Sequence, residues 1–159
     1  MKHVHLLYLL LIPLSSFGQK YVTPDGDFMD TTSGRTGQCI FSNAYYYQVK
    51  GKYPKSSETL LSEVEKWMQT TNLHNSQSGY ITFRFEVDCE GHPLKKVRVF
   101  QTDEYYKDFH FDKAFVNELY NYSKTLDSWK IAKHKTDVFY YTTLITFKIH
   151  NGKVVNIIP

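Results

Sequence analysis

Hydrophobic and polar residues alternate along three segments of the chain, which is the pattern of strands with one buried face. Residues 80–88 predict a first strand, and residues 94–100, after a turn at Gly91, predict its antiparallel partner. A long strand is predicted over 137–149, and the hairpin signal Asn151-Gly152 predicts a short closing strand after it. The inward positions are Ile81, Phe83, Phe85, Val87, Val97, Val99, Phe139, Tyr141, Thr143, Ile145, Phe147 and Ile149.

Two other segments carry hydrophobic residues at intervals of three and four, which predicts amphipathic helices. The first is expected over 57–71, with Ser56 or Ser57 as its N-cap. The second is expected over 112–126, and Trp129 should fill the core beneath it, because so large a side chain is costly to expose. The buried positions would be Leu60, Leu61, Val64, Trp67 and Met68 in one helix, and Phe111, Phe115, Val116, Leu119, Tyr122 and Leu126 in the other.

This order of elements predicts an α+β domain over 56–159: a hairpin, a helix, a long C-terminal strand and a short closing strand, with one further helix ahead. Its sheet should be small and mostly antiparallel. Residues 19–55 are expected to be an irregular N-terminal segment, since Pro and Gly interrupt its first half. Within it, 40–49 is interpreted as an extended segment or an edge strand.

The first 18 residues have the pattern of a secretory signal peptide. Lys2 precedes an apolar run over 6–12, and Ser16 and Gly18 are small residues at a cleavage site. The run is much shorter than the roughly 20 apolar residues of a membrane-spanning helix. We therefore expect cleavage after Gly18 and export to the periplasm or beyond, without a stable membrane anchor. An uncleaved anchor is the alternative.

Export changes the interpretation of the two cysteines, Cys39 and Cys89. In an oxidising compartment an even pair favours a disulfide. Two separate thiols remain the alternative. A metal site is the least favoured hypothesis, because neither cysteine has a second cysteine or a histidine at ligand spacing.

The sequence carries no recognisable catalytic motif. It lacks a His-Glu-Xaa-Xaa-His pair, a Gly-Xaa-Ser-Xaa-Gly elbow and a phosphate-binding glycine loop. The turn that holds Asp88, Cys89, Glu90 and His92 is interpreted as structural and solvated, although Cys89 and His92 could imitate a thiol–imidazole pair. The formal charge of +3, without a basic stripe, argues against nucleic acid. We thus expect a non-enzymatic protein with no cofactor and no catalytic or metal-binding residue.

Four segments resemble the TonB C-terminal domain family. Residues 79–99 (Gly-Tyr-Ile-Thr-Phe-Arg-Phe-Glu-Val-Asp through to Val-Arg-Val) resemble its opening hairpin, and 111–114 (Phe-Asp-Lys-Ala) the start of its helix. Residues 129–132 (Trp-Lys-Ile-Ala) resemble its Trp-Xaa-Pro-Ala signature, with Ile131 in place of the proline, and 139–149 resemble its final strand. The family's Tyr-Pro element, membrane helix and proline-rich spacer are not seen. The resemblance implies a stand-alone secreted form, such as those of Bacteroidota, without the tether that transmits force.

The resemblance also implies that the protein binds partners in the cell envelope. The partner would be an envelope protein or an extended peptide, with an outer-membrane receptor as one candidate, and it would add a strand to a free sheet edge. Self-pairing into a homodimer is a further expectation. The candidate edge residues are Phe139, Tyr141, Thr143, Ile145, Phe147 and Val155.

The 13 tyrosines and 11 phenylalanines leave an alternative open. Aromatic residues favour strands, so a high content needs no special explanation. A tyrosine-rich surface would instead suit a glycan or peptidoglycan, with the sugars stacked on aromatic rings. The residues for that surface would be Tyr45, Tyr46, Tyr47, Tyr105 and Tyr106.

Overall fold

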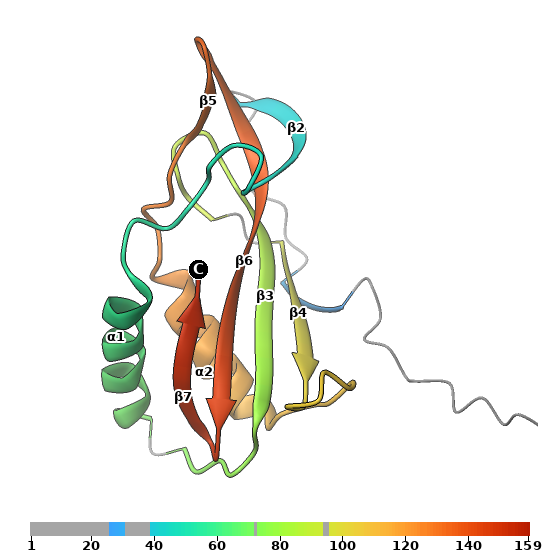
Figure 1. The fold of residues 1–159 in the computed structure, drawn as a ribbon, viewed down its shortest axis with the longest axis vertical. Coiled ribbons are helices and arrows are strands. Elements are labelled where there is room, and N and C mark those ends of the chain that lie inside the picture. Colours follow the sequence, from blue (N-terminus) through green and yellow to red (C-terminus); the bar gives the residue numbers. More distant parts are fainter. Residues whose placement is uncertain (1–25, 31–38, 72, 94–95) are drawn as a thin grey trace, which may run out of the picture.

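The computed structural model describes residues 26–30, 39–71, 73–93 and 96–159. Over these residues the chain forms one sheet of seven strands with two helices, which confirms the predicted α+β class. Figure 1 shows helix α2 behind the sheet and helix α1 beside the outer strand β7. The predicted signal peptide, 1–18, lies outside the described residues.

The strands follow the order β1-β4-β3-β6-β2, and β5 and β7 also pair with β6. All pairings are antiparallel except that of β2 with β6, which is parallel. The strands are β1 (Asp27–Asp30), β2 (Ile40–Tyr45), β3 (Gly79–Val87), β4 (Val97–Thr102), β5 (Ala132–His134), β6 (Asp137–His150) and β7 (Lys153–Ile158).

Within the described residues, strand β6 pairs with more strands than any other: β2, β3, β5 and β7. Its residue Tyr141 pairs with Val87 of β3 on one side and with Ala44 of β2 on the other. Further along, Thr146 pairs with Thr82 of β3 and, across the strand, with β7. The sequence therefore predicts this strand well, but it does not reveal that strands lie on both of its sides.

Helix α1 begins where its predicted capping residue lies, and helix α2 begins one residue after the start of its predicted range. Helix α1 (Ser57–Gln69) has Ser56 as its N-cap, with the side-chain hydroxyl accepting from the Thr59 amide at 3.2 Å. Helix α2 (Lys113–Lys124) starts after Asp112, whose carboxylate accepts two backbone amides of the first turn. The two helices are joined because the Tyr122 hydroxyl donates to the backbone carbonyl of Leu60 at 3.2 Å.

The core lies between the helices and one face of the sheet. The alternating residues of β3 and β6 supply its sheet side, and the helical stripes cover them. Trp129 is buried against the rings of Tyr53 and Phe85, with centroids 5.0 and 5.2 Å away, and its indole N–H donates to the Leu126 carbonyl at 2.8 Å. The predicted role of this tryptophan is therefore confirmed.

The segment 19–55 is not irregular throughout, which corrects the sequence-based expectation. Its residues 40–45 form β2, as the alternative interpretation allowed, and residues 27–30 form β1, which the sequence did not indicate. Strand β1 is short, and its pairing with β4 holds it in an extended conformation. The Arg98 guanidinium of β4 lies over the Phe28 ring of β1, 4.5 Å from its centroid, and strengthens that pairing.

The predicted disulfide is present. Cys39 and Cys89 are bonded, with their Cα atoms 5.5 Å apart. The bond joins the residue before β2 to the turn after β3, so it fastens the N-terminal part of the chain to the central hairpin.

Candidate functional site

Most of the predicted partner-binding residues do not lie at an edge, so this prediction is wrong for β6. Tyr141, Ile145 and Phe147 are fully buried in the core, and Thr143 is 1% exposed. Phe139 is partly buried, packs against the core and pairs with Ile40 of β2 and Ala132 of β5. The physical reason is that alternation along a strand reports which face is buried, whereas the number of neighbouring strands depends on segments distant in sequence.

Val155 is the one predicted edge residue that the structure places on an outer strand. Its side chain is 42% exposed, and Ile158 on the same strand is 56% exposed. Lys148 pairs with Asn156 and Ile149 with Val154, so Val155 has no partner across the pair and forms a β-bulge. Within the described residues, the backbone of β7 pairs with β6 alone, and helix α1 lies alongside the strand.

A groove runs beside the first half of β7. It has a volume of about 350 Å³ and lies between helix α1 and the strand. Met68 and Leu73 contribute apolar surface, Glu65 and Lys153 contribute opposite charges, and Val154 belongs to the strand itself. No sequence pattern indicates this groove, since its walls come from α1, α2, the segment after α1 and the β6–β7 turn.

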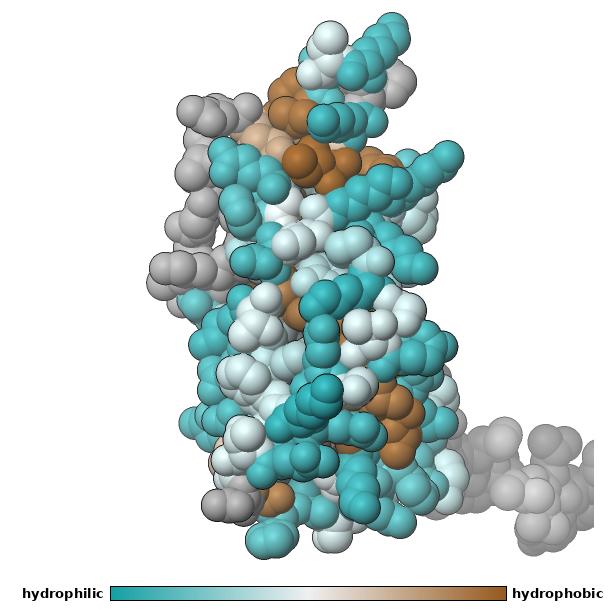
Figure 2. Space-filling model, turned by 90° about the vertical axis from the view of Figure 1, so that its left-hand side faces the viewer, coloured by the Kyte–Doolittle hydropathy of each residue, from teal (hydrophilic) through white to brown (hydrophobic). Residues whose placement is uncertain are grey.

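The surface around this groove is largely hydrophilic. Figure 2 views the molecule from the side of α1, and hydrophilic side chains cover most of this face. Hydrophobic patches are small, with the larger ones in the upper part, at the level of β2 in Figure 1. A partner on the lower part of this face would thus depend on backbone hydrogen bonds and a few side-chain contacts, and not on a wide apolar interface.

The opposite rim of the sheet is covered by the protein itself. Strand β1 pairs with the first half of β4. The loop after β4 folds back on its second half, where Thr102 bridges Asp108 and the Phe109 amide donates to the Gln101 carbonyl at 3.3 Å. Strand addition to β4 itself would have to displace these native pairs, and β1 is the terminal strand on this side.

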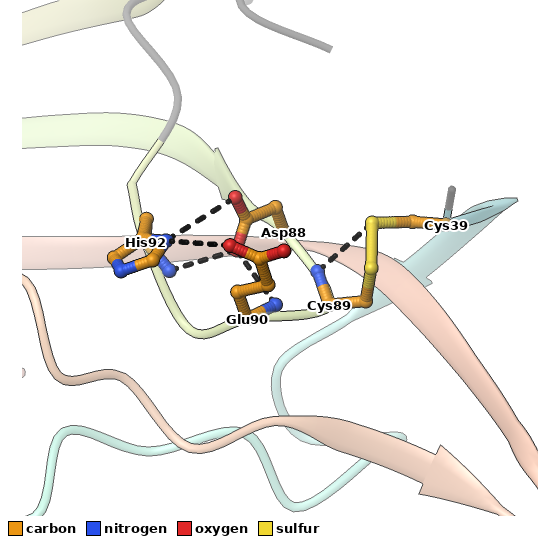
Figure 3. The surroundings of a disulfide bond; sticks show 5 residues. All are labelled: Cys39, Asp88, Cys89, Glu90 and His92. Carbon is orange, nitrogen blue, oxygen red and sulfur yellow. Dashed lines mark hydrogen bonds and ion pairs between the residues drawn. A yellow bond between two sulfur atoms is a disulfide. The ribbon is translucent and has the colours of Figure 1, made fainter. Parts of the chain in front are cut away.

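The turn after β3 brings three possible ligand side chains together (Figure 3). His92 Nδ1 lies 3.6 Å from a carboxylate oxygen of both Asp88 and Glu90. Asp88 is already engaged, because its Oδ1 accepts the backbone amides of Glu90 and His92 at 2.9 and 2.8 Å. This is the only group of three in the described residues that could hold a metal ion, and its bonds are those of a stabilised turn. The Cys89 sulfur lies in the disulfide, so it supplies no thiol for a thiol–imidazole pair.

The five predicted tyrosines form two clusters at opposite ends of the molecule. Tyr45, at the end of β2, stacks with Tyr47 in the turn after it, with centroids 5.8 Å apart, in the upper part of Figure 1. Tyr106 stacks on Tyr80 at 4.9 Å, in the loop region after β4 at the bottom. A single continuous tyrosine surface, as the glycan alternative assumed, is therefore not formed.

Two buried tyrosines have structural roles that the sequence did not assign. The Tyr141 hydroxyl donates to the Lys130 carbonyl at 2.6 Å, and burial raises the pKa of this phenol. Burial likewise raises the pKa of Tyr122, whose hydroxyl joins the two helices. Both groups remain protonated at neutral pH and act as hydrogen-bond donors inside the core.

The comparisons with known proteins give no family assignment. No protein-family model matches the chain, and searches of curated proteins and of solved structures also find no match. No helix in the described part of the chain is both long and apolar enough to cross a membrane. The features that remain are an α+β fold and a disulfide that is compatible with export.

Proposed function

We propose that the protein is an exported, non-enzymatic module that binds an extended peptide segment of an envelope protein along the outer edge of β7. The single observation that carries this proposal is that β7, within the described residues, pairs with β6 and with no other strand, so that a peptide could pair with it between β7 and the neighbouring helix α1. A free edge presents unpaired amides and carbonyls, which an extended peptide can pair with. The likeness of residues 79–99 to the TonB C-terminal domain family supports the same proposal, with an outer-membrane receptor as one candidate partner.

The surroundings of β7 favour a peptide over a flat protein surface. A strand added beside β7 would point alternate side chains to the two faces of the sheet. On one face they would meet the groove that Met68 and Leu73 line, and on the other the exposed side chains of Val155 and Ile158. The partner would then be recognised through apolar side chains at alternate positions.

The disulfide supports the proposed location. Disulfides persist in oxidising compartments and are rare in the cytosol. Cys39 and Cys89 are bonded, and the N-terminal pattern over 1–18 is that of a cleaved signal peptide. We therefore place the protein in the periplasm or outside the cell.

Site-specific photocrosslinking in native cells tests the proposal. A photoreactive residue at Val155 or Ile158 should give a discrete adduct whose mass identifies the partner, a second copy of this chain included. The same residue at Tyr105, which is 73% exposed in the loop after β4, across the sheet from β7, is the matched control. Val155→Lys should reduce the adduct at Ile158, since a charge on an edge strand opposes strand addition, whereas Tyr105→Lys should not. Adducts at Tyr105 alone, or none from β7, would contradict the proposal.

A further inference from the structure

Two shallow grooves adjoin where the turn after β2 contacts the segment after α2. One has a volume of about 510 Å³ and is lined by Tyr47 and Lys50, among others, and the other has a volume of about 540 Å³ and includes Ser128. Both are lined by Lys52 and Lys130, so the two grooves adjoin, and together they are called the channel here.

The channel carries a concentration of positive charge. Lys50, Lys52 and Lys130 are exposed, and within the described residues no carboxylate forms an ion pair with them. Lys55 also lines the channel but is neutralised by Glu63 at 2.7 Å. No aspartate or glutamate is among the described lining residues, although Asp127 and Glu63 lie close enough to Tyr53 and Lys55 to act on them electrostatically. A cleft lined by one sign of charge attracts a ligand of the opposite sign.

Backbone bonds hold these lysines in place. Lys130 N–H donates to the Lys52 carbonyl at 3.2 Å, and the buried Tyr141 hydroxyl donates to the Lys130 carbonyl. Gly51 donates to the Tyr46 carbonyl at 2.7 Å, and its missing side chain lets the turn lie directly on the Tyr141 ring. The site is thus built on the protein core, although its lysines are 78 positions apart in the chain (from 52 to 130).

These bonds also argue against a peptide as the ligand. The Lys130 amide and the Lys52 and Lys130 carbonyls already have partners within the chain, so they are not free for pairing with an added strand. What the channel offers is ammonium groups and a tyrosine ring. Tyr47 is 65% exposed, and the face of such a ring attracts the C–H groups of a sugar.

We infer that this channel, defined by Tyr47, Lys50, Lys52 and Lys130, binds an acidic oligosaccharide through sugar stacking on Tyr47 and charge pairing with the three lysines. It does not rest on the peptide-binding proposal, because it shares no residue with the edge of β7. Carboxylate and phosphate groups on the sugar would both pair with lysine.

Calorimetric titration with defined oligosaccharides tests the inference. The probes are decagalacturonate and a phosphorylated malto-oligosaccharide, with neutral maltodecaose as the uncharged comparison and polyglutamate as an acidic peptide. At least one acidic sugar should bind, more weakly as salt is added, while maltodecaose binds at least about tenfold more weakly. The double variant Lys52→Gln/Lys130→Gln should lose about tenfold in affinity, and Tyr47→Ala several-fold.

Matched controls make the outcome decisive. Lys107→Gln and Tyr105→Ala remove the same side-chain types from exposed positions after β4, at the other end of the fold, and should bind like the unmodified protein. The inference is overturned if neither acidic sugar binds, or if the lysine variant retains full affinity. The inference is also overturned if polyglutamate binds as tightly as the acidic sugars and Tyr47→Ala changes neither the affinity for polyglutamate nor the affinity for the sugars.

Discussion

The phenol of Tyr141 shows how a single side chain connects the core to the surface. Its ring lies on the inward face of β6, under the turn at Gly51, and its hydroxyl fixes the carbonyl of Lys130. The alternation of β6 predicts that this residue is buried, but no sequence pattern predicts the partner of its hydroxyl. One buried group thus holds two segments that are remote in the chain.

Replacing this phenol should change how stability depends on pH. At pH 7, Tyr141→Phe should lower the free energy of unfolding by about 1 kcal/mol, because the Lys130 carbonyl loses its donor. Burial raises the pKa of Tyr141 in the folded state, so above pH 10 the unfolded chain releases its proton first and folding stability falls. The phenylalanine variant lacks this loss.

The difference in the free energy of unfolding between the unmodified protein and Tyr141→Phe should therefore shrink as pH rises from 9 to 11, as measured by urea unfolding at each pH. Tyr105→Phe, which removes an exposed hydroxyl, is the control and should follow the unmodified protein throughout. A difference that stays constant or grows above pH 10 would show that the phenol is not held protonated by the fold.

At the scale of elements, residues with a strong local signal were predictable. Ser56 and Asp112 mark the helix starts, and Ile81 to Val87 alternates as strand β3 does. The short strands β1 and β5 were not predicted, because pairing with a neighbour holds them in place and their own sequences carry little alternation. A local pattern can report an element, but it cannot report a partner strand that is distant in sequence.

The same limit explains what was missed at the candidate sites. Val155 was predicted because the hairpin signal before it places a closing strand. The position of β6 inside the sheet, the groove beside α1 and the channel at Lys52 and Lys130 all depend on contacts between remote segments. The pairing of Cys39 with Cys89 was predictable because the chain offers no other cysteine.

The disulfide should stabilise the whole arrangement of β2 and β3. It closes a loop with a sequence separation of 50 residues, and the loss of that constraint from the unfolded chain corresponds to about 4 kcal/mol. Cys39→Ser/Cys89→Ser should therefore lower the free energy of unfolding in urea by about this amount, and the reduced unmodified protein should behave like the variant. A loss below about 1 kcal/mol, with or without reductant, would mean that the bond contributes little.

At the scale of the whole molecule, the fold separates two kinds of surface. The lower part offers the free edge of β7 beside the α1 groove, and the upper part carries the tyrosines and lysines around the end of β2. The rim at β4 is closed by β1 and by the loop after it. The account depends on the asymmetry between β7, which pairs with a strand on one side, and β3 and β6, which pair on two, because a module that binds by strand addition needs an open edge.

Amide hydrogen exchange, measured residue by residue by NMR, tests this asymmetry most directly. Amides of β3 and β6 should exchange slowly, since both strands are paired on two sides. Along β7, amides that bond to β6 should be protected, while outward-facing amides should exchange orders of magnitude faster. Uniform protection along β7, equal to that of β6, would show that the edge is already occupied and would contradict the account.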